Sequence, residues 1–194
     1  DRTKWDKVVT DFGNLEIGGR NLLSGTKDFS TVSTPSFVTE ETYLGFKVIH
    51  GSYSGLDYVD ICTWYNAIIP EPNQYYTLSF YCKGISVVES YFAPNACAEN
   101  YSSDGYHGTA VDGYTPVQLT SEWRRVWIVF KTRDDVSGLK NLYVMRLRTD
   151  GEGYVCGVMF EKGNKATDWT PSIDDVDLAI SGINSTASAA LSKA

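Results

Sequence analysis

Histidine and cysteine are scarce in this chain of 194 residues, and the familiar catalytic motifs are missing. There are two histidines, His50 and His107, and four cysteines without a CxxC spacing. The nucleophile-elbow, zinc-protease, phosphate-loop and complete dinucleotide signatures are absent. Neighbouring acids such as Glu40 and Glu41 point to opposite faces of a strand, so they do not form an acid/base pair. The sequence favours a protein that is not an enzyme, although carboxylates far apart in the chain leave a glycosidase open.

Basic residues are also few. Lys and Arg number 17 against 24 Asp and Glu, which gives a net charge of −7 and a pI of about 4.8. Binding to nucleic acid or to an anionic membrane needs clustered positive charge, so we expect neither partner. No apolar run approaches the length of a transmembrane helix. The chain has no signal peptide and starts at Asp1 rather than Met, which we interpret as a piece of a longer polypeptide.

Three of the cysteines fall inside predicted strands. Cys62, Cys82 and Cys156 lie among alternating apolar residues, where a reduced thiol behaves as a small buried hydrophobe. We therefore expect free thiols in preference to disulfides.

Apolar residues make up 42% of the chain, and 13 of its residues are Tyr. Short alternating stretches separated by Gly, Pro, Asn and Ser turns predict strands. These stretches are Tyr43–His50, Tyr58–Tyr65, Tyr75–Lys83, Ile85–Phe92, Pro116–Leu119, Trp123–Lys131, Asn141–Thr149 and Tyr154–Glu161. About eight short strands without intervening helices predict an all-β fold, a jelly-roll β-sandwich of two antiparallel sheets.

Alternation along each strand also assigns the two faces of the sheets. The residues expected to point inward are Leu78, Phe80, Val126, Ile128, Phe130, Tyr143, Met145, Leu147, Cys156, Val158 and Phe160. Trp123 and Trp169 are also assigned to the core, with Trp169 closing one end of the sandwich. Thr77, Ser79, Tyr81, Arg125, Trp127, Arg146 and Arg148 are expected on the outer faces.

The two ends of the chain have helical patterns. Residues 1–16 carry Trp5, Val8, Phe12 and Leu15 at spacings of 3, 4 and 3, as at the end of an upstream helix. Residues 172–194 carry Val176, Ile180, Ile183, Ala187 and Ala190 at spacings of 4, 3, 4 and 3, a heptad seam that needs partner helices. With residues 17–171 between them, we expect a β-module set between coiled-coil segments, trimeric by analogy with fibres built in this way.

Four stretches together resemble one family. Ile17–Leu23 resembles the opening motif of modules in phage tail and baseplate proteins. Tyr76–Gly84 and Glu122–Val126 resemble strands of jelly-roll carbohydrate-binding modules, and Glu161–Pro171 resembles their closing motif. The resemblance covers about residues 17–172. Cys82 departs from the small residue usual at its place, and the loop 93–115 is long.

The resemblance implies a non-catalytic carbohydrate-binding module in a phage tail or baseplate protein, assembled in the bacterial cytoplasm and carried on the virion. Its implied partners are a host cell-wall or surface saccharide and other tail subunits. Two alternatives remain: a purely structural spacer or decoration domain of a tail fibre, and a polysaccharide hydrolase, which the sequence favours least.

Sugar binding needs aromatic rings for the pyranose face and planar polar groups for the hydroxyls. The candidates for stacking are Trp64, Tyr81, Tyr91, Tyr101, Tyr106 and Trp127. The candidates for polar contacts are Arg146, Arg148, Asn95, Asp104 and His107. Several of them fall in the irregular stretch 93–115, and a loop of that length is often functional.

No cofactor is expected, apart from the structural calcium ion that is common in the modules this sequence resembles. Calcium needs several oxygen ligands from converging loops. Asp28 near the start and Asp168 near the end of the module are the candidate ligands.

Overall fold

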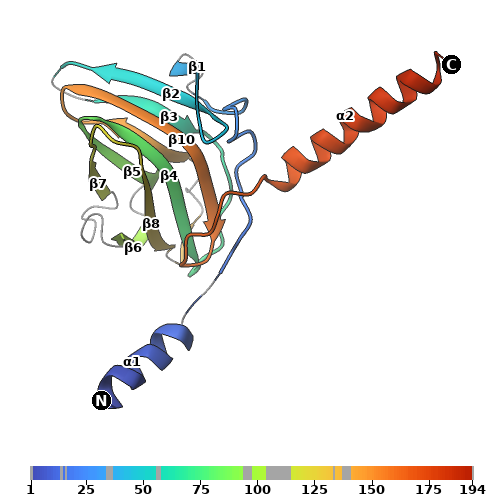
Figure 1. Cartoon of the computed structure of the whole chain (residues 1–194). Coiled ribbons are helices and arrows are strands. Elements are labelled where there is room, and N and C mark those ends of the chain that lie inside the picture. Colours follow the sequence, from blue (N-terminus) through green and yellow to red (C-terminus); the bar gives the residue numbers. More distant parts are fainter. Residues whose placement is uncertain are drawn as a thin grey trace.

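A computed structural model describes residues 2–13, 15, 17–33, 37–55, 58–93, 98–103, 115–132, 134–136 and 141–193. Within them the chain forms two antiparallel sheets (Figure 1). The six-stranded sheet has the order β1(Val38–Tyr43), β2(Phe46–Tyr53), β10(Gly151–Lys162), β4(Tyr75–Ile85), β8(Arg124–Thr132) and β6(Ala98–Ser103). The four-stranded sheet has the order β3(Val59–Trp64), β9(Asn141–Leu147), β5(Val87–Ala93) and β7(Thr115–Gln118). The expected all-β sandwich is confirmed at this level.

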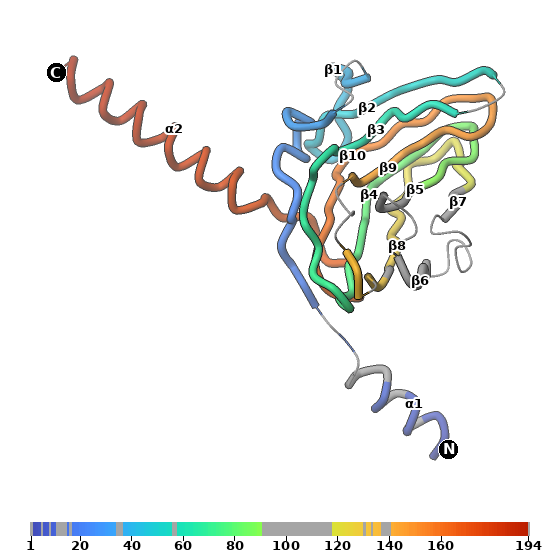
Figure 2. The backbone as a smooth tube through the Cα atoms, turned by 180° about the vertical axis from the view of Figure 1, so that it is seen from behind, coloured from blue at the N-terminus to red at the C-terminus, as the bar shows by residue number. Residues whose placement is uncertain are grey.

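The core lies between the two sheets, which are one behind the other in Figures 1 and 2. Leu78 and Phe80 of β4 point into it, as alternation predicts, and lie beside Ile128 and Val126 of the neighbouring strand β8 on the same face of the sheet. The ring of Phe160 stacks on Tyr76, with ring centres 5.4 Å apart. Burial of these side chains, at about 25 cal/mol per Å² of apolar surface, is the main force that holds the sheets together.

Two of the predicted assignments are wrong, one of a strand and one of an irregular stretch. The expected strand Tyr43–His50 is a hairpin, because Leu44 and Gly45 both have positive φ and make the turn between β1 and β2. The stretch 93–115, expected to be irregular, contains β6, which pairs with β8 at the edge of the six-stranded sheet. Short polar strands at a sheet edge have little apolar alternation, so the sequence does not reveal them.

Tyr143 was expected in the core, and the structure corrects this. Glu89 of β5 is paired with Arg146 of β9, and Tyr91 is paired with Tyr143. Between these two pairs β5 advances by two residues and β9 by three, so β9 contains one extra residue. An extra residue of this kind reverses the direction of the side chains that follow it. Tyr143 therefore reaches the outer face, where its ring lies 4.9 Å from the guanidinium of Arg146.

Part of the outer face of the six-stranded sheet is covered by the chain itself. Thr77, Ser79 and Glu161 are buried although they are on that face. The segments 17–22 and 163–170 cross over them, and the Thr77 hydroxyl donates to the carbonyl of Gly163 at 2.9 Å.

Helices occur at both ends, α1(Arg2–Gly13) and α2(Ile173–Leu191), and both project from the sandwich in Figure 1. Ser172 caps α2, since its hydroxyl accepts from Asp175 N while the Asp175 carboxylate accepts from Ser172 N. No residue of α2 is buried, and Ile183 on its apolar seam is 68% exposed. Neither helix, over its described residues, has the length and apolar character needed to cross a membrane.

The expectation of free thiols is confirmed for Cys62, Cys82 and Cys156, which are all buried and reduced. Burial raises the pKa of both the Cys82 and the Cys156 thiols to about 12. These thiols are uncharged at neutral pH and serve as small core residues. Cys97 lies outside the described residues.

Candidate functional site

The outer face of the four-stranded sheet carries an ion pair at its centre. Asp60 of β3 and Glu89 of β5 lie opposite Arg146 of β9, one on each side. Arg146 Nε donates to Asp60 Oδ1 at 2.5 Å, and Nη2 donates to Oδ2 at 3.0 Å. The two side chains are 14% and 18% exposed. Such a forked, partly buried pair fixes both groups in one geometry.

A second pair lies beside the first. Arg148 Nε is 3.3 Å from Glu89 Oε1, and the Glu89 side chain is 10% exposed. Burial raises the pKa of Glu89, while the charges of Arg148 and Arg146 oppose that rise. Two guanidinium groups and two carboxylates thus balance each other on this face.

Tyrosine rings flank the charged groups. The guanidinium carbon of Arg146 lies 3.8 Å from the ring centre of Tyr58, and that of Arg148 lies 5.8 Å from it. Tyr65 meets Tyr143 edge to face at 6.2 Å. Tyr58 is 42% exposed and Tyr65 is 48% exposed. Cation–π contacts of this kind hold an aromatic ring in place while it remains open to solvent.

We call this surface the tyrosine–arginine face, made up of Tyr58, Asp60, Tyr65, Glu89, Tyr143, Arg146 and Arg148. It offers exposed rings beside planar hydrogen-bonding groups, which is the combination that a polar ligand with apolar faces requires. Asp60 uses both oxygens on one guanidinium, so it is held as a fixed acceptor instead of a free base or nucleophile. This arrangement suits binding better than bond cleavage.

The predicted site residues divide between two sheets. Arg146 and Arg148 lie on the tyrosine–arginine face, and the backbone of Tyr91 pairs with Tyr143 there. Trp64 was expected to stack on a ligand, and this is wrong. Its side chain is in the core, only 4% exposed, and its Nε1 donates to Thr31 Oγ1 at 3.0 Å.

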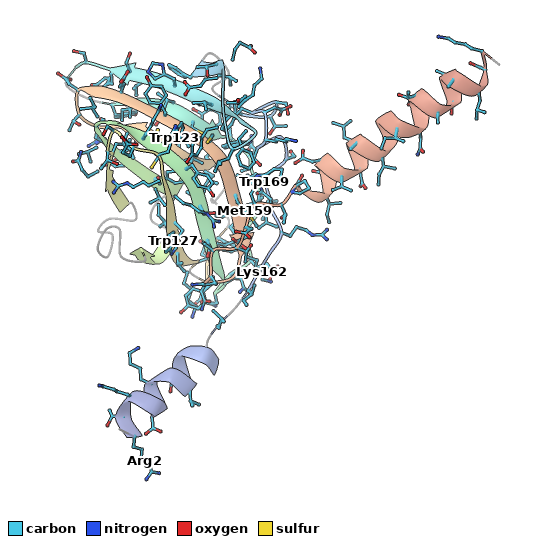
Figure 3. All side chains as sticks on the ribbon, in the orientation of Figure 1. Arg2, Trp123, Trp127, Met159, Lys162 and Trp169 are labelled. Atoms are coloured by element: carbon cyan, nitrogen blue, oxygen red, sulfur yellow. The ribbon has the colours of Figure 1, made fainter. Side chains whose placement is uncertain are left out.

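Tyr81 and Trp127 lie on the opposite side of the sandwich. Both are on the outer face of the six-stranded sheet, where the backbone of Trp127 pairs with that of Ser79 of β4; Figure 3 labels Trp127 among the side chains of this part of the sandwich. Tyr81 is close to Tyr43, with ring centres 5.7 Å apart. No single groove therefore contains both these residues and Arg146.

Tyr81 borders a second group of rings, which we call the lysine–aromatic cluster: Tyr43, His50, Tyr81, Lys83, Trp123 and Tyr154. Trp123 was assigned to the core, but it is only partly buried and stacks on Tyr43 at 4.4 Å. Lys83 Nζ lies 5.1 Å from the Trp123 ring centre and 4.6 Å from that of Tyr154. None of these rings is as open to solvent as Tyr58 and Tyr65, which leaves this cluster a weaker candidate for a site.

Other predicted positions are beyond what the structure describes. Asn95, Asp104, Tyr106 and His107 lie outside the described residues. The backbone of Tyr101 is in β6, opposite Phe130, and its side chain is not described. The roles of these residues remain predictions.

The proposed calcium ligands have other surroundings. Asp28 Oδ1 accepts from Ser30 N at 3.0 Å. Asp168 is fully exposed, 3.8 Å from the guanidinium of Arg125. Among the residues that the structure describes, no group of three or more His, Cys, Asp or Glu side chains comes close enough together to hold a metal ion. The calcium site remains an untested prediction.

Sequence reasoning missed five members of the site: Tyr58, Asp60, Tyr65 and Glu89 were not proposed, and Tyr143 was assigned to the core. Tyr58 and Asp60 alternate with Val59 and Ile61, so their parity alone places them on an outer face. Glu89 has no comparable signal, since its partner Arg148 is found only once β5 is paired with β9.

No protein-family model matches the chain, and no curated protein matches it. Solved structures with a similar fold include the tripod from the baseplate of bacteriophage Tuc2009, at 12% identity and a TM-score of 0.48 over 83% of this chain and 61% of that one. A family 16 carbohydrate-binding module has 16% identity and a TM-score of 0.43 over 72% of this chain and 99% of that one. The CBM22-1 xylan-binding domain of Paenibacillus barcinonensis Xyn10C has 15% identity and a TM-score of 0.46 over 78% and 99%. This chain thus spans less than two thirds of the tripod chain. Similarities this distant concern the fold and carry no functional conclusion.

Proposed function

We propose that the chain is a non-catalytic saccharide-binding module of the jelly-roll kind and that the tyrosine–arginine face is its binding surface. The observation that carries this proposal is the exposed ring of Tyr58 beside Arg146, whose guanidinium is fixed by Asp60. The Arg146 guanidinium covers one face of the Tyr58 ring at 3.8 Å, so a pyranose would stack on the other, open face, with its hydroxyls directed toward the more exposed Arg148–Glu89 pair beside the ring. The groups are positioned before binding, which lowers the entropy lost on association.

The charge balance of the face favours a neutral saccharide. An anionic sugar would have to displace Asp60 or Glu89 from its guanidinium, and the net charge of −7 opposes its approach. Hydroxyl groups of a neutral sugar carry no charge that competes for either guanidinium, so they can bind without breaking either pair.

The test is isothermal titration with a panel of soluble neutral polysaccharides, namely laminarin, xylan, mannan and galactan, and with polygalacturonate as the anionic comparison. We expect a neutral member to bind, and Tyr58→Ala to weaken binding by about tenfold or more, since truncating an aromatic residue that dominates a binding surface typically costs about 2 kcal/mol. The matched control is Tyr154→Ala on the opposite sheet, which should bind like the wild type. Loss of binding in the control alone would overturn the assignment of the face.

The wider context of the module is also a proposal. The motif set Ile17–Leu23 through Glu161–Pro171 supports a place in a phage tail or baseplate, where the module attaches the virion to host saccharides beside other tail subunits. We propose that α2 self-associates as a parallel homotrimer through Val176, Ile180, Ile183, Ala187 and Ala190, with two further copies of the same helix as the occupants of the seam.

The exposure and spacing of these apolar side chains support the trimer, since a seam with this repeat is stable only when covered. Sedimentation equilibrium of the chain should give a trimer that Ile183→Asp dissociates. Leu178→Asp, equally exposed on another side of α2, should leave it intact. A monomer at every concentration would contradict this part of the proposal.

A structural spacer without a ligand is the second candidate. The mutual pairing of Asp60 with Arg146 and of Glu89 with Arg148 favours it, because a spacer also needs every buried charge satisfied. No binding to any member of the polysaccharide panel, together with no retention on host cell walls, would support the spacer. Release of oligosaccharides from the panel would point instead to a hydrolase.

A further inference from the structure

The chain joins and leaves the sandwich through two segments that lie side by side. The incoming segment is residues 17–22, and the outgoing segment is residues 163–170. Ile17 forms a parallel bridge with Lys165, so the two segments run in the same direction. The Thr170 hydroxyl donates to the carbonyl of Gly19 at 3.3 Å and accepts from Asn21 N at 3.3 Å.

A buried carboxylate joins both segments to β10. Glu161 is fully buried, and its carboxylate accepts from Gly19 N at 2.8 Å on the incoming side. On the outgoing side it accepts from Thr167 N at 2.9 Å and from the Thr167 hydroxyl at 2.8 Å. One side chain thus holds three donors from two segments that are more than 140 residues apart in the sequence.

The incoming segment also completes the edge of β10. Strand β2 pairs with β10 only as far as Val155. Beyond this point Leu22 N donates to the carbonyl of Phe160 at 2.7 Å. The Asn21 side-chain amide then makes the hydrogen bonds that the backbone of a neighbouring strand would make: its oxygen accepts from Phe160 N and its nitrogen donates to the carbonyl of Val158, both at 3.1 Å.

The outgoing segment is anchored further along its length. Trp169 Nε1 donates to Thr26 Oγ1 at 3.0 Å, and Gly25 N donates to Asp175 Oδ1 in the first turn of α2 at 2.7 Å. Arg125 donates to the carbonyl of Thr167 from the underlying sheet. The base of α2 is therefore tied to the same junction as the incoming chain.

The direction of the two segments decides how they carry load. In Figure 1, α1 lies beyond the start of the incoming segment and α2 beyond the end of the outgoing one. A pull between the helices draws the two parallel segments past each other. Their hydrogen bonds are then loaded together in shear, whereas a hairpin pulled from its ends opens one bond at a time.

We propose that this junction is a force-bearing clamp. Tension between α1 and α2 passes through the incoming segment, Glu161, Thr170 and the outgoing segment, and the rest of the sandwich lies outside this path and carries no tension. The tyrosine–arginine face would then keep its geometry under load. The clamp depends only on the path of the chain, so it stands or falls independently of saccharide binding.

Single-molecule force spectroscopy tests the clamp on the full chain, with handles attached at Arg2 and Lys193. Thr170→Val removes the bridging hydroxyl with little change of shape. We expect it to shorten the lifetime at fixed force about fivefold to tenfold, because the two bonds that it removes are long, at 3.3 Å, and stand at the weak end of the net range for a hydrogen bond, so that together they change the rate by about that factor. The matched control is Thr39→Val, which removes the 2.9 Å bond to the Val48 carbonyl away from the junction and should leave the lifetime unchanged.

Pulling geometry provides a second readout on the same molecules. With both handles moved into the sandwich, at the β1–β2 turn (Gly45) and the β9–β10 turn (Asp150), neither segment lies on the loaded stretch of chain, and Thr170→Val should behave like the wild type. Urea unfolding confirms that each variant is folded, and Asn21→Ala repeats the test at a second position. Equal lifetimes for wild type and Thr170→Val under the α1–α2 pull, or an equal effect of Thr39→Val, would overturn the clamp.

Discussion

Replacing Arg146 should reveal how rigidly the tyrosine–arginine face is built. Removing one partner of a fully buried ion pair costs about 3–5 kcal/mol, and an exposed pair contributes about 0–1 kcal/mol. Arg146 and Asp60 are 14% and 18% exposed, close to the buried limit. Arg146→Ala also removes the contact with the Tyr58 ring at 3.8 Å. We therefore expect it to lower the free energy of unfolding by about 2–3 kcal/mol.

A double-mutant cycle separates the pair from the rest of each side chain. Arg146→Ala, Asp60→Ala and the double variant should show a coupling energy of about 2 kcal/mol in urea unfolding, followed by the intrinsic tryptophan fluorescence of the chain. The control cycle uses Lys47 and Glu40, a 3.0 Å pair whose Glu40 side chain is 95% exposed. That cycle should give less than about 0.5 kcal/mol. If the two cycles give the same small coupling, the central pair is not preorganised and the reasoning about this face is refuted.

Three further outcomes can be checked on the same protein. Burial raises the pKa of Glu89 above its ordinary 4.5, so the folded state holds that proton more tightly than the unfolded state does. In urea unfolding, the free energy of unfolding of the wild type relative to Glu89→Gln should therefore be greatest below pH 4.5 and should fall as the pH rises through the raised pKa. A difference that does not change with pH would contradict this. Gly18→Ala should lower the free energy of unfolding by about 2 kcal/mol or more, because a Cβ there would lie 1.8 Å from the Lys162 carbonyl oxygen. Gly182→Ala, a helix position with open space around it, should raise the free energy of unfolding by up to about 1 kcal/mol; thermal unfolding measures both. N-ethylmaleimide should leave Cys82 and the other two buried thiols unmodified in the folded protein and label them in urea, as read by peptide mass spectrometry; labelling in the fold would show that the core opens.

Alternation predicted the part of the fold in which one sheet face is buried and the other is not. Leu78 and Phe80 of β4 point inward as expected, and Arg146 and Arg148 point outward. Along β4, and from Arg146 to Arg148, the period of two is uninterrupted, so sequence parity gives the face directly.

Irregular pairing accounts for the errors. In β3, the register shifts on both sides of Cys62, so Trp64 turns into the core although its parity matches that of Asp60. In β9, an extra residue sends Tyr143 outward. Such shifts depend on the partner strand, which a single sequence does not identify.

Long-range covering is a second source of error. Thr77 and Ser79 lie on the outer face, as their positions in the alternation predict, but the incoming segment 17–22 and the outgoing segment 163–170 cover that face and bury them. The candidate site has the same character, because Asp60, Glu89 and Arg146 come together only through the order β3-β9-β5. The sequence was sufficient to predict Arg146 and Arg148, whereas their partners Asp60 and Glu89 are identified only once the strand order is known.

The most direct test of saccharide binding is a chemical-shift titration of the isotopically labelled chain with the neutral polysaccharide that binds in the panel. The account predicts perturbed signals at Tyr58, Tyr65, Arg146 and Arg148, and unperturbed signals at Lys83 and in the rest of the lysine–aromatic cluster. Perturbations confined to the six-stranded sheet, with the tyrosine–arginine face unchanged, would contradict it.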